Sequence, residues 1–403
     1  MKVGIHKSVP AGVVTAPPSK SVAHRMVLCA ALSEGVSVIK NIALSDDIAA
    51  TLECITSFGA AYSHHNGILK VTGVGADRLS FQKPLDCREC GSTIRFFTPL
   101  CMISKSGGTL TGSARLMERP LALYEQICAD NSIPYEREGL TIKVGGGMRG
   151  GTFTVPGNVS SQYISGLLFA LPLLEGDSRI ILTGRVESRP YIDLTLSVQR
   201  LFGISNSWTG NDTLYIKGGC RYRCANAENE GDWSNAAFLF ALRNFGFDVE
   251  VNGVNENSLQ GDKVCKEIFC ALKKEKGTFD LSDRPDLAPI LFAYAAANHG
   301  AVFTGTKRLR IKESDRAAAM AEELLKFGCR IVVNENSVIV PGGGIHPPKD
   351  VLYGHNDHRI VMSLAVLCVL TGGVIEGAEA VKKSYPGFFE DLRKLKVYCT
   401  DET

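Results

Sequence analysis

The sequence lacks the features that mark several large protein classes. Lys and Arg total 44 against 42 for Asp and Glu, so no sign of charge is in excess. This balance does not predict broad electrostatic binding of nucleic acid or of an acidic membrane, and an anion must be bound by locally placed groups. The longest hydrophobic runs, residues 164–174 and 363–371, are shorter than the roughly 18 residues that a transmembrane helix needs. No signal-peptide core follows Met1, so we expect a soluble, cytoplasmic protein.

Motifs of common enzyme classes are also absent. There is no Gly-x-Gly-x-x-Gly between a strand and a helix, no His-Glu-x-x-His and no Gly-x-Ser-x-Gly. The 13 cysteines are odd in number and scattered, which favours reduced thiols over a disulfide framework. Cys87 and Cys90 have metal-ligand spacing, but no second pair follows at the distance of a zinc site. We therefore expect neither a metal nor a cofactor.

What remains is a globular chain with an internal repeat. The 403 residues contain 45% hydrophobic residues and suit two domains of about 200 residues each. A helix, a glycine stop and a tight hairpin recur at residues 47–73, 193–218 and 314–342, and more weakly at 119–145. Six units of about 67 residues would fill the 403 residues, three in each domain.

The repeats predict an α+β fold. One helix and one small sheet cannot bury their apolar faces alone, whereas three units packed with helices inside and sheets outside can. Residues 161–174 and 360–370 are apolar nearly all round, as a central helix requires. The polar stretch 221–232 is the best domain boundary, with a second crossing of the chain near residues 16–19.

Basic residues gather at one predicted helix start. Two prolines end an extended stretch before residues 22–32, which read as a helix, so Lys20 and Ser21 lie at its N-terminus. Arg25 follows one turn later, on the same side as Ser21. Free N–H groups, a lysine, a hydroxyl and an arginine converge there, as binding of a phosphate demands.

The same arrangement recurs at residues 91–95 (GSTIR), 312–316 (KESDR) and 356–359 (NDHR). A cation in the first turn opposes the helix dipole by up to about 1 kcal/mol, so we expect a bound anion to offset it. Residues 160–162 (SSQ) start another apolar helix, and Asp286 precedes residues 287–297. For these last two the N-cap interpretation stays open.

Taken in order, residues 17–25, 91–95, 309–316 and 356–359 resemble the 5-enolpyruvylshikimate-3-phosphate synthases, over about residues 6–396. The resemblance implies two domains of three helix–sheet units, residues 19–230 and residues 1–18 with 231–403, joined by a two-strand hinge. It also implies transfer of the enolpyruvyl group of phosphoenolpyruvate to the 5-hydroxyl of shikimate 3-phosphate. That step of chorismate and aromatic amino-acid biosynthesis releases phosphate through a tetrahedral ketal and is inhibited by glyphosate at the phosphoenolpyruvate site.

The resemblance assigns roles residue by residue. Lys20, Asp286 and Glu313 would be catalytic, the two carboxylates moving protons. Shikimate 3-phosphate would contact Lys20, Ser21, Arg25, Ser160, Ser161, Gln162, Ser188, Asp286 and Lys312. Phosphoenolpyruvate would contact Lys20, Gly91, Arg119, Gln162, Arg316, Arg359 and Lys383. Two substrates with two phosphates and two carboxylates require such a set of lysines and arginines.

Three positions depart from the best-studied branch of the family: Glu89 and Arg308 replace Asn, and Phe96 replaces Pro. Two other functions fit the sequence less well. An enolpyruvyl transferase acting on a UDP-amino sugar would have a reactive loop Cys that is absent here. A module binding phosphate or RNA ends would need neither Asp286 nor Glu313. We expect a monomer that binds only small molecules.

Overall fold

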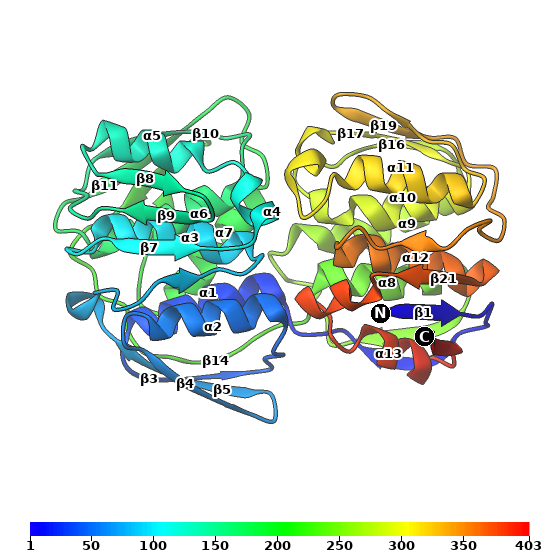
Figure 1. Ribbon diagram of the computed structural model, residues 1–403, viewed down its shortest axis with the longest axis horizontal. Helices are drawn as coiled ribbons and strands as arrows, with labels where there is room; N and C mark the ends of the chain where they lie inside the picture. Colours follow the sequence, from blue (N-terminus) through cyan, green and yellow to red (C-terminus); the bar gives the residue numbers. More distant parts are fainter. Residues whose placement is uncertain (403) are drawn as a thin grey trace. The chain divides into compact units, whose positions relative to one another are not determined.

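In the computed structural model, which describes residues 1–402, the chain forms two compact units. The central unit is Pro18–Glu230, and the terminal unit combines Met1–Pro17 with the chain from Gly231 onward. The chain therefore passes between them at Pro17–Pro18 and at Glu230–Gly231. Figure 1 shows that both ends of the chain belong to the terminal unit. Within residues 1–402, none of the helices combines the length and hydrophobicity that a transmembrane segment needs.

The central unit is built from three repeats of strand, helix, strand, helix and hairpin. The first contains α1 (Lys20–Leu32), β3 (Glu34–Lys40), α2 (Asp46–Thr56), β4 (Ala61–His65) and β5 (Ile68–Val74), with β14 (Asn226–Glu228) as its outer strand. The second contains β6 (Leu85–Asp86), α3 (Gly91–Ile103), β7 (Gly108–Thr111), α4 (Ala114–Glu118), α5 (Ala122–Asp130), β8 (Tyr135–Glu138) and β9 (Thr141–Val144). The third contains β10 (Thr152–Pro156), α6 (Ser161–Ala170), β11 (Ser178–Thr183), α7 (Arg189–Leu201), β12 (Ser207–Trp208) and β13 (Thr213–Ile216).

The terminal unit repeats the same order twice, and a third time in shortened form. One repeat contains β16 (Gly277–Asp280), α10 (Ala288–Ala297), β17 (Ala301–Thr304), α11 (Arg316–Lys326), β18 (Val332–Val333) and β19 (Ser337–Val340). The next contains β20 (Leu352–Tyr353), α12 (His358–Thr371), β21 (Gly373–Glu376), α13 (Phe388–Lys394) and β22 (Cys399–Glu402), completed by β1 (Lys2–Ile5) between β21 and β22. The shortened repeat contains β2 (Ala11–Thr15), α8 (Trp233–Asn244), β15 (Asp248–Asn252) and α9 (Cys265–Lys274).

Every sheet begins with a parallel pair. The pairs are β14–β3, β6–β7, β10–β11, β16–β17, β20–β21 and β2–β15. In four of them a buried helix connects the two strands directly. In the other two the first strand comes from a distant part of the chain: β2 pairs with β15, and β14 pairs with β3. β2 lies just before the first passage of the chain between the units, and β14 just before the second, so each passage follows a strand that completes a sheet.

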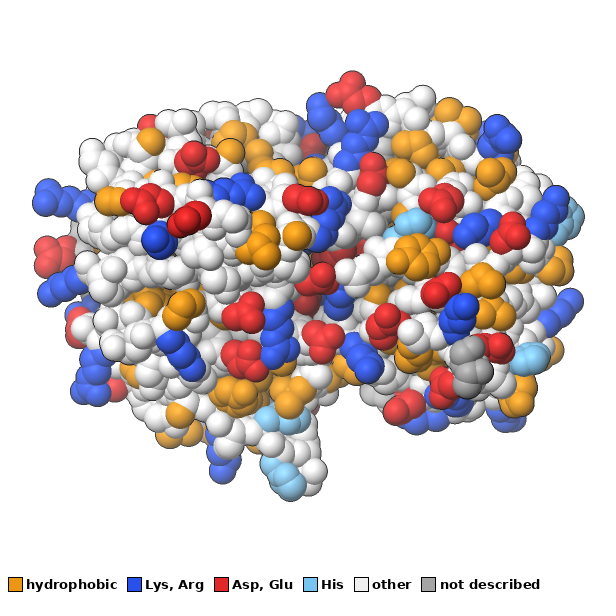
Figure 2. Space-filling view, viewed as in Figure 1, with side chains coloured by type: hydrophobic (Ala, Val, Ile, Leu, Met, Phe, Trp, Pro, Cys, Tyr) orange, Lys and Arg blue, Asp and Glu red, His pale blue; other side chains and the backbone are white. Residues whose placement is uncertain are grey.

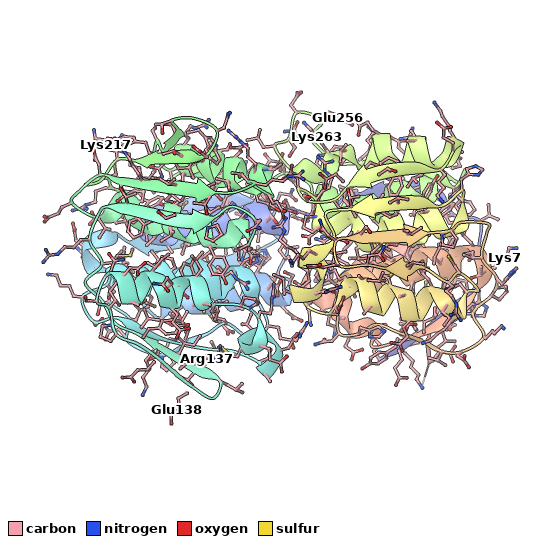
Figure 3. The ribbon with its side chains drawn as sticks, turned by 90° about the horizontal axis from the view of Figure 1, so that it is seen from above. Lys7, Arg137, Glu138, Lys217, Glu256 and Lys263 are labelled. Atoms are coloured by element: carbon pink, nitrogen blue, oxygen red, sulfur yellow. The ribbon has the colours of Figure 1, made fainter. Side chains whose placement is uncertain are left out.

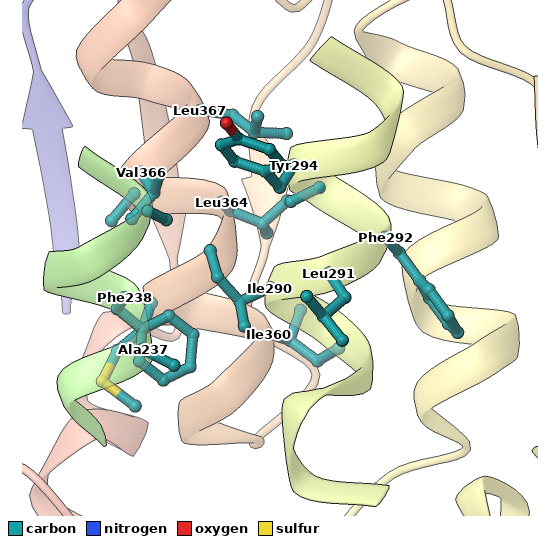
Figure 4. Close-up of a cluster of buried hydrophobic side chains, with 14 of the residues drawn as sticks. Ala237, Phe238, Ile290, Leu291, Phe292, Tyr294, Ile360, Leu364, Val366 and Leu367 are labelled. Carbon is teal, nitrogen blue, oxygen red and sulfur yellow. The ribbon is translucent and has the colours of Figure 1, made fainter. Parts of the chain in front are cut away.

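The helices divide into a buried and a half-buried set. In α1, α3, α6, α8, α10 and α12 nearly every residue is buried, whereas α2, α5, α7, α9, α11 and α13 bury one face only. Figure 4 shows the core of the terminal unit, where Phe238 of α8, Ile290 of α10 and Leu364 of α12 pack together. A helix with no polar face must lie inside, so the sheets cover it, as predicted.

The predicted helix–hairpin repeats are confirmed at all four places. In the β4–β5 hairpin, Asn66 and Gly67 take φ values of 48° and 73°, the left-handed pair that a tight two-residue turn requires. Two details differ from the sequence prediction. The helix expected to reach residue 174 ends at Ala170, because Pro172 lacks the N–H that would continue it. The repeat that contains α8 has no closing hairpin, so its sheet has two strands.

Charged side chains on the surface are mixed in sign. Figure 2 shows lysine and arginine interspersed with aspartate and glutamate over the visible face, without a broad area of one sign. Figure 3 shows Glu138, at the β8–β9 turn, and Lys217, after β13, extending away from the sheets. The face shown therefore agrees with the near-zero net charge.

Candidate active site

The helix start at Lys20 is built as predicted. Ser19 caps α1, its hydroxyl oxygen accepting a hydrogen bond from Val22 N at 3.4 Å. Lys20 Nζ lies 2.7 Å from Asp47 Oδ2 in the first turn of α2, and the two side chains are 14% and 13% exposed. No acidic residue lies in the first turn of α1 itself. The positive end of the helix dipole and the ammonium therefore reinforce each other here.

Arg25 mainly braces the central unit. Its guanidinium donates to Ser21 O at 2.6 Å, to Thr195 Oγ1 at 2.8 Å, to Tyr191 O at 3.1 Å and to Ser165 Oγ at 3.4 Å. Burial lowers its pKa to about 10. Four of the five N–H donors of the group are thus used to join α1, α6 and α7. One donor is left for the predicted contact with shikimate 3-phosphate.

Gly91, the first residue of α3, lies against two guanidinium groups. A Cβ atom at this position would be 2.7 Å from Arg119 Nη1 and 2.7 Å from Arg95 Nη1, closer than real contacts come. Arg119 and Arg95 are 7% and 3% exposed. Close approach of these arginines therefore requires glycine here. The structure brings together Gly91 and Arg119, both predicted to contact phosphoenolpyruvate.

Arg95 fixes the side chain of Gln162. Its Nη1 donates to Gln162 Oε1 at 2.9 Å, its Nη2 donates to Pro120 O at 3.2 Å, and the guanidinium lies 5.2 Å from the centre of the Tyr163 ring. The Gln162 amide nitrogen in turn donates to Ser92 Oγ at 3.0 Å. The orientation of the amide is thereby determined from both sides, which places a predicted substrate contact on a rigid support.

Three predicted serine contacts occupy helix starts. Ser160 caps α6, its hydroxyl accepting from Gln162 N at 3.3 Å, so the open N-cap interpretation holds for this residue. Ser161, the first residue of α6, is 6% exposed. Ser188 precedes α7 with a φ of 57°, a left-handed conformation that costs a non-glycine residue on the order of 1–3 kcal/mol.

In the terminal unit, Arg316 is the centre of an ion-pair cluster. Its side chain is 1% exposed and donates to Asp357 Oδ2 at 2.8 Å, to Asp286 Oδ1 at 2.8 Å and to Glu313 Oε2 at 2.7 Å. Asp286 also accepts from Lys312 at 3.2 Å and from Arg359 at 3.2 Å. Carboxylates of the protein therefore pair with the cations at the starts of α11 and α12, and the anion expected there from the sequence stays a prediction.

The cluster changes the proton affinity of its members. Burial opposes ionisation of Asp286, but Arg359, Lys312 and Arg316 together hold its pKa well below the usual range. Burial lowers the pKa of Lys312 although Asp286 opposes the effect. Burial also opposes the charge on Arg316, but Asp357, Glu313 and Asp286 raise its pKa. Asp286 is thus a carboxylate in this state, able to accept a proton but weakly basic.

A strained turn precedes α12. His355 and Asn356 have φ values of 48° and 52°, both left-handed. Lys383 Nζ donates to Asn356 O at 2.7 Å, and Asp357 caps the helix by accepting from Arg359 N at 2.9 Å. Lys383 and Arg359, both predicted to contact phosphoenolpyruvate, are therefore attached to the two ends of the same short segment.

Three buried or half-buried residues of these clusters were not predicted: Asp47, Asp262 and Asp357. Asp357 lies inside the string NDHR, so the motif could have pointed to it. Asp262 is 1% exposed and accepts a hydrogen bond from the Ser234 hydroxyl. Burial and the charge of Asp286 raise its pKa to about 6, although Arg359 opposes the effect. No local pattern marks Asp47 or Asp262, because each meets its partners only through the fold.

Comparison with known proteins gives one consistent result. The family model described as EPSP synthase (3-phosphoshikimate 1-carboxyvinyltransferase) matches residues 6–392. A protein named 3-phosphoshikimate 1-carboxyvinyltransferase from Clostridium perfringens (strain SM101) is 40% identical, with 100% of both chains covered. One of the same name from Clostridium kluyveri is 39% identical, covering 98% of this chain and 97% of that protein.

A solved structure supports the fold. EPSP synthase from Acinetobacter baumannii matches with a TM-score of 0.80 at 24% identity, covering 99% of this chain and 100% of that one. A likeness at this identity concerns the fold alone. Together with the match over residues 6–392 and the relatives near 40% identity, it shows that the chain belongs to the EPSP synthase family.

Proposed function

We propose that the chain is a transferase that moves the enolpyruvyl group of phosphoenolpyruvate to the 5-hydroxyl of shikimate 3-phosphate and releases phosphate. The observation that carries this proposal is the Arg316 cluster. One buried guanidinium pairs with both Asp286 and Glu313, the two carboxylates expected to move protons. The reaction requires two such groups, because one proton leaves a hydroxyl while another is added to a methylene carbon.

Substrate anions would be bound by cations already held in place. Lys20, Ser21, the remaining donor of Arg25, residues 160–162, Ser188 and Lys312 are proposed to contact shikimate 3-phosphate. Lys20, Gly91, Arg119, Gln162, Arg316, Arg359 and Lys383 are proposed to contact phosphoenolpyruvate. Several of these side chains are held by hydrogen bonds or ion pairs with other groups of the protein, so little order has to be gained on binding.

Binding of phosphoenolpyruvate would also prepare the base. Asp286 pairs with Arg316, Arg359 and Lys312, and each of these cations lowers the proton affinity of its carboxylate. A phosphate or carboxylate of the substrate that draws Arg316 or Arg359 toward itself removes part of that effect. The pKa of Asp286 then rises toward the range of a useful base. The weak basicity of Asp286 without substrate is thus consistent with its proposed role.

The proposed proton transfers balance. Asp286 takes the proton of the 5-hydroxyl while the hydroxyl oxygen bonds to C2 of phosphoenolpyruvate, and Glu313, protonated in the substrate complex, gives its proton to C3, forming the tetrahedral ketal. Glu313 then takes a proton back from the new methyl group as the C–O bond to phosphate breaks, and the proton held by Asp286 leaves with the phosphate. Lys20 stabilises the anionic groups of both substrates throughout. The net reaction consumes no external acid, base or oxidant.

Phosphate release with defined substrates tests the proposal. We expect phosphate only when phosphoenolpyruvate and shikimate 3-phosphate are both present. Release with a UDP-amino sugar in place of shikimate 3-phosphate, or no release with any acceptor, would contradict it. We also predict that the protein is a cytoplasmic monomer and that it needs no cofactor. Activity that persists after dialysis against a chelator would support the prediction of no cofactor.

A further inference from the structure

Three side chains of different types meet beside Lys20. His24 comes from α1, Asp47 from the first turn of α2, and Cys90 from the N-cap of α3. One imidazole nitrogen, one carboxylate oxygen and the thiol sulfur all lie within 4.8 Å of one another. His24 and Cys90 are buried, whereas the Asp47 side chain is 13% exposed. The group is thus closed on one side and reachable from the side of Asp47 and Lys20.

The imidazole is already oriented as a ligand. His24 Nδ1 lies 2.7 Å from Thr51 Oγ1, and this hydroxyl oxygen lies 2.7 Å from Thr93 Oγ1 and 3.4 Å from Asp47 O. In the tautomer with the ring proton on Nδ1, Thr51 accepts that proton and the Nε2 lone pair faces Cys90. Metal-binding histidines are commonly held in this way through their other nitrogen.

The spacing suits a tetrahedral ion. His24 Nε2 and Cys90 Sγ are 3.8 Å apart. With Zn–N near 2.0–2.1 Å and Zn–S near 2.3 Å, a tetrahedral zinc ion places these two atoms about 3.6 Å apart. One edge of the coordination polyhedron is therefore almost formed. Nitrogen, sulfur and carboxylate oxygen together favour Zn²⁺ or Cd²⁺ over Mg²⁺ or Ca²⁺.

We propose that His24, Asp47 and Cys90 form a site for a soft divalent cation, Zn²⁺ or Cd²⁺, which displaces the Lys20 ammonium from Asp47. In the state described here Lys20 Nζ, 2.7 Å from Asp47 Oδ2, is the cation of this group. Metal binding transfers the thiol proton of Cys90 to solvent, and the ion with one thiolate and one carboxylate is then neutral. Because Asp47 no longer holds the Lys20 ammonium in position for the substrates, bound metal inhibits the reaction; this consequence, unlike binding itself, rests on the proposed function.

A second cluster shows the contrast. Glu322, Glu323 and His355 also bring ligand atoms within 4.8 Å of one another. However, Glu323 already accepts from Lys326 at 2.9 Å and 3.0 Å, from Tyr353 N at 2.9 Å and from His355 at 3.0 Å. Its two oxygens are saturated by protein donors, so this cluster carries no metal proposal.

The test measures metal binding without substrates. Cd²⁺ is titrated into the whole protein, followed by thiolate-to-metal absorption and by equilibrium dialysis. We expect Cys90→Ser, whose hydroxyl still caps α3, to lose this absorption and at least tenfold of the affinity. Lys20→Met, which removes the competing cation, should bind Cd²⁺ at least threefold more tightly. The double variant Cys224→Ser/Cys270→Ser removes two exposed thiols and should bind like the parent.

Unchanged Cd²⁺ affinity in Cys90→Ser, or weaker binding by Lys20→Met, would overturn the site. The activity arm is separate: Zn²⁺ should inhibit phosphate release by the parent at least tenfold more strongly than by Cys90→Ser, and a chelator should reverse it. Equal inhibition of both proteins would overturn the inhibitory role. Absence of phosphate release from the parent without metal would overturn the proposed function and leave the binding result standing.

Discussion

Two clusters of cations are balanced by different groups: the central cluster around Lys20, Arg25 and Arg95, and the terminal cluster around Arg316, Arg359 and Lys312. In the central unit Lys20, Arg25 and Arg95 lie near helix starts, and Lys20 pairs with Asp47. Arg25 and Arg95 bond mainly to neutral oxygens. In the terminal unit the carboxylates Asp286, Glu313 and Asp357 bind Arg316, Arg359 and Lys312.

This difference separates two tasks. Cations held by neutral groups keep their charge for a substrate anion, as binding of a dianionic phosphate requires. A cation that is already paired with a carboxylate interacts with that carboxylate and with the substrate anion at once. When the substrate draws the cation away, the pKa of the carboxylate changes. The central cluster is therefore suited to binding and the terminal cluster to proton transfer. The predictions below test that division.

The largest effect is expected from Lys20→Met. The substitution removes a cation proposed to serve both substrates, worth several kcal/mol where water is excluded, so turnover should fall at least about 10³-fold. The fold should persist, because methionine places an unbranched side chain of similar length in this largely buried position. Lys40→Met, at the exposed end of β3, is the matched control and should keep parental turnover. Turnover of Lys20→Met within tenfold of the parent would remove α1 from the active site.

Next in size are Asp286→Asn and Glu313→Gln. Each should lower turnover by at least about 10²-fold, as expected for loss of a proton-transfer group. The KM for phosphoenolpyruvate should stay the same or fall, because Arg316 is released from one carboxylate. Asp315→Asn is a suitable control, since asparagine can still cap α11 through Ala318 N. Near-normal turnover of either variant would mean that the residue only pairs with Arg316.

The sequence predicted more of the fold than of the site. The repeats were visible because helix periodicity, a glycine stop and a hairpin are local signals. The helix starts at Lys20, Gly91, Arg316 and Arg359 were visible for the same reason. What was not visible is which acid faces which base: Asp47 meets Lys20 across 27 positions, and Asp357 meets Arg316 across 41. Such pairs depend on helix packing, which no single stretch of sequence specifies.

A smaller effect is expected from Gly91→Ala. The added Cβ would lie 2.7 Å from nitrogens of Arg119 and Arg95, so the guanidinium groups must move. We expect the parent to be inhibited by glyphosate in competition with phosphoenolpyruvate. The inhibition constant of the variant should rise at least about tenfold, or 1.4 kcal/mol, because the longer inhibitor has less room to adjust. The KM for phosphoenolpyruvate should rise less, though measurably, since Arg119 is displaced.

Gly151→Ala controls for the loss of a glycine as such, because a Cβ there meets nothing within 4 Å. Steady-state inhibition kinetics on the three proteins decides the matter. An inhibition constant unchanged by Gly91→Ala would show that this glycine does not line the inhibitor site, and would leave the approach of Arg119 and Arg95 to Gly91 as a purely structural feature.

The smallest effect concerns Asp262, a carboxylate beside the terminal cluster. It is buried near Asp286, Arg359 and Asp232, and its pKa is raised to about 6 from an ordinary value of 3.8. The native state therefore binds more protons than the unfolded state between these pH values. The free energy of unfolding contributed by Asp262 falls as the pH rises through this window. At neutral pH the ionised group thus destabilises the fold.

Asp262→Asn removes that ionisation and can still accept a hydrogen bond from Ser234. The variant should gain stability relative to the parent as the pH rises from 5 to 8, by about 1 kcal/mol. Denaturant unfolding at the two pH values measures the change. Ser234→Ala sharpens the test. In the parent the hydrogen bond from Ser234 lowers the pKa of Asp262, so removing that hydrogen bond should raise this pKa and move the pH window of lost stability to higher pH. If the difference between Asp262→Asn and the parent does not depend on pH between 5 and 8, Asp262 is ionised in the fold over this whole range, as it is in the unfolded chain. The terminal cluster would then carry the negative charge of Asp262 already at pH 5, and its cations would be more completely balanced than the pairing with Asp286, Glu313 and Asp357 indicates.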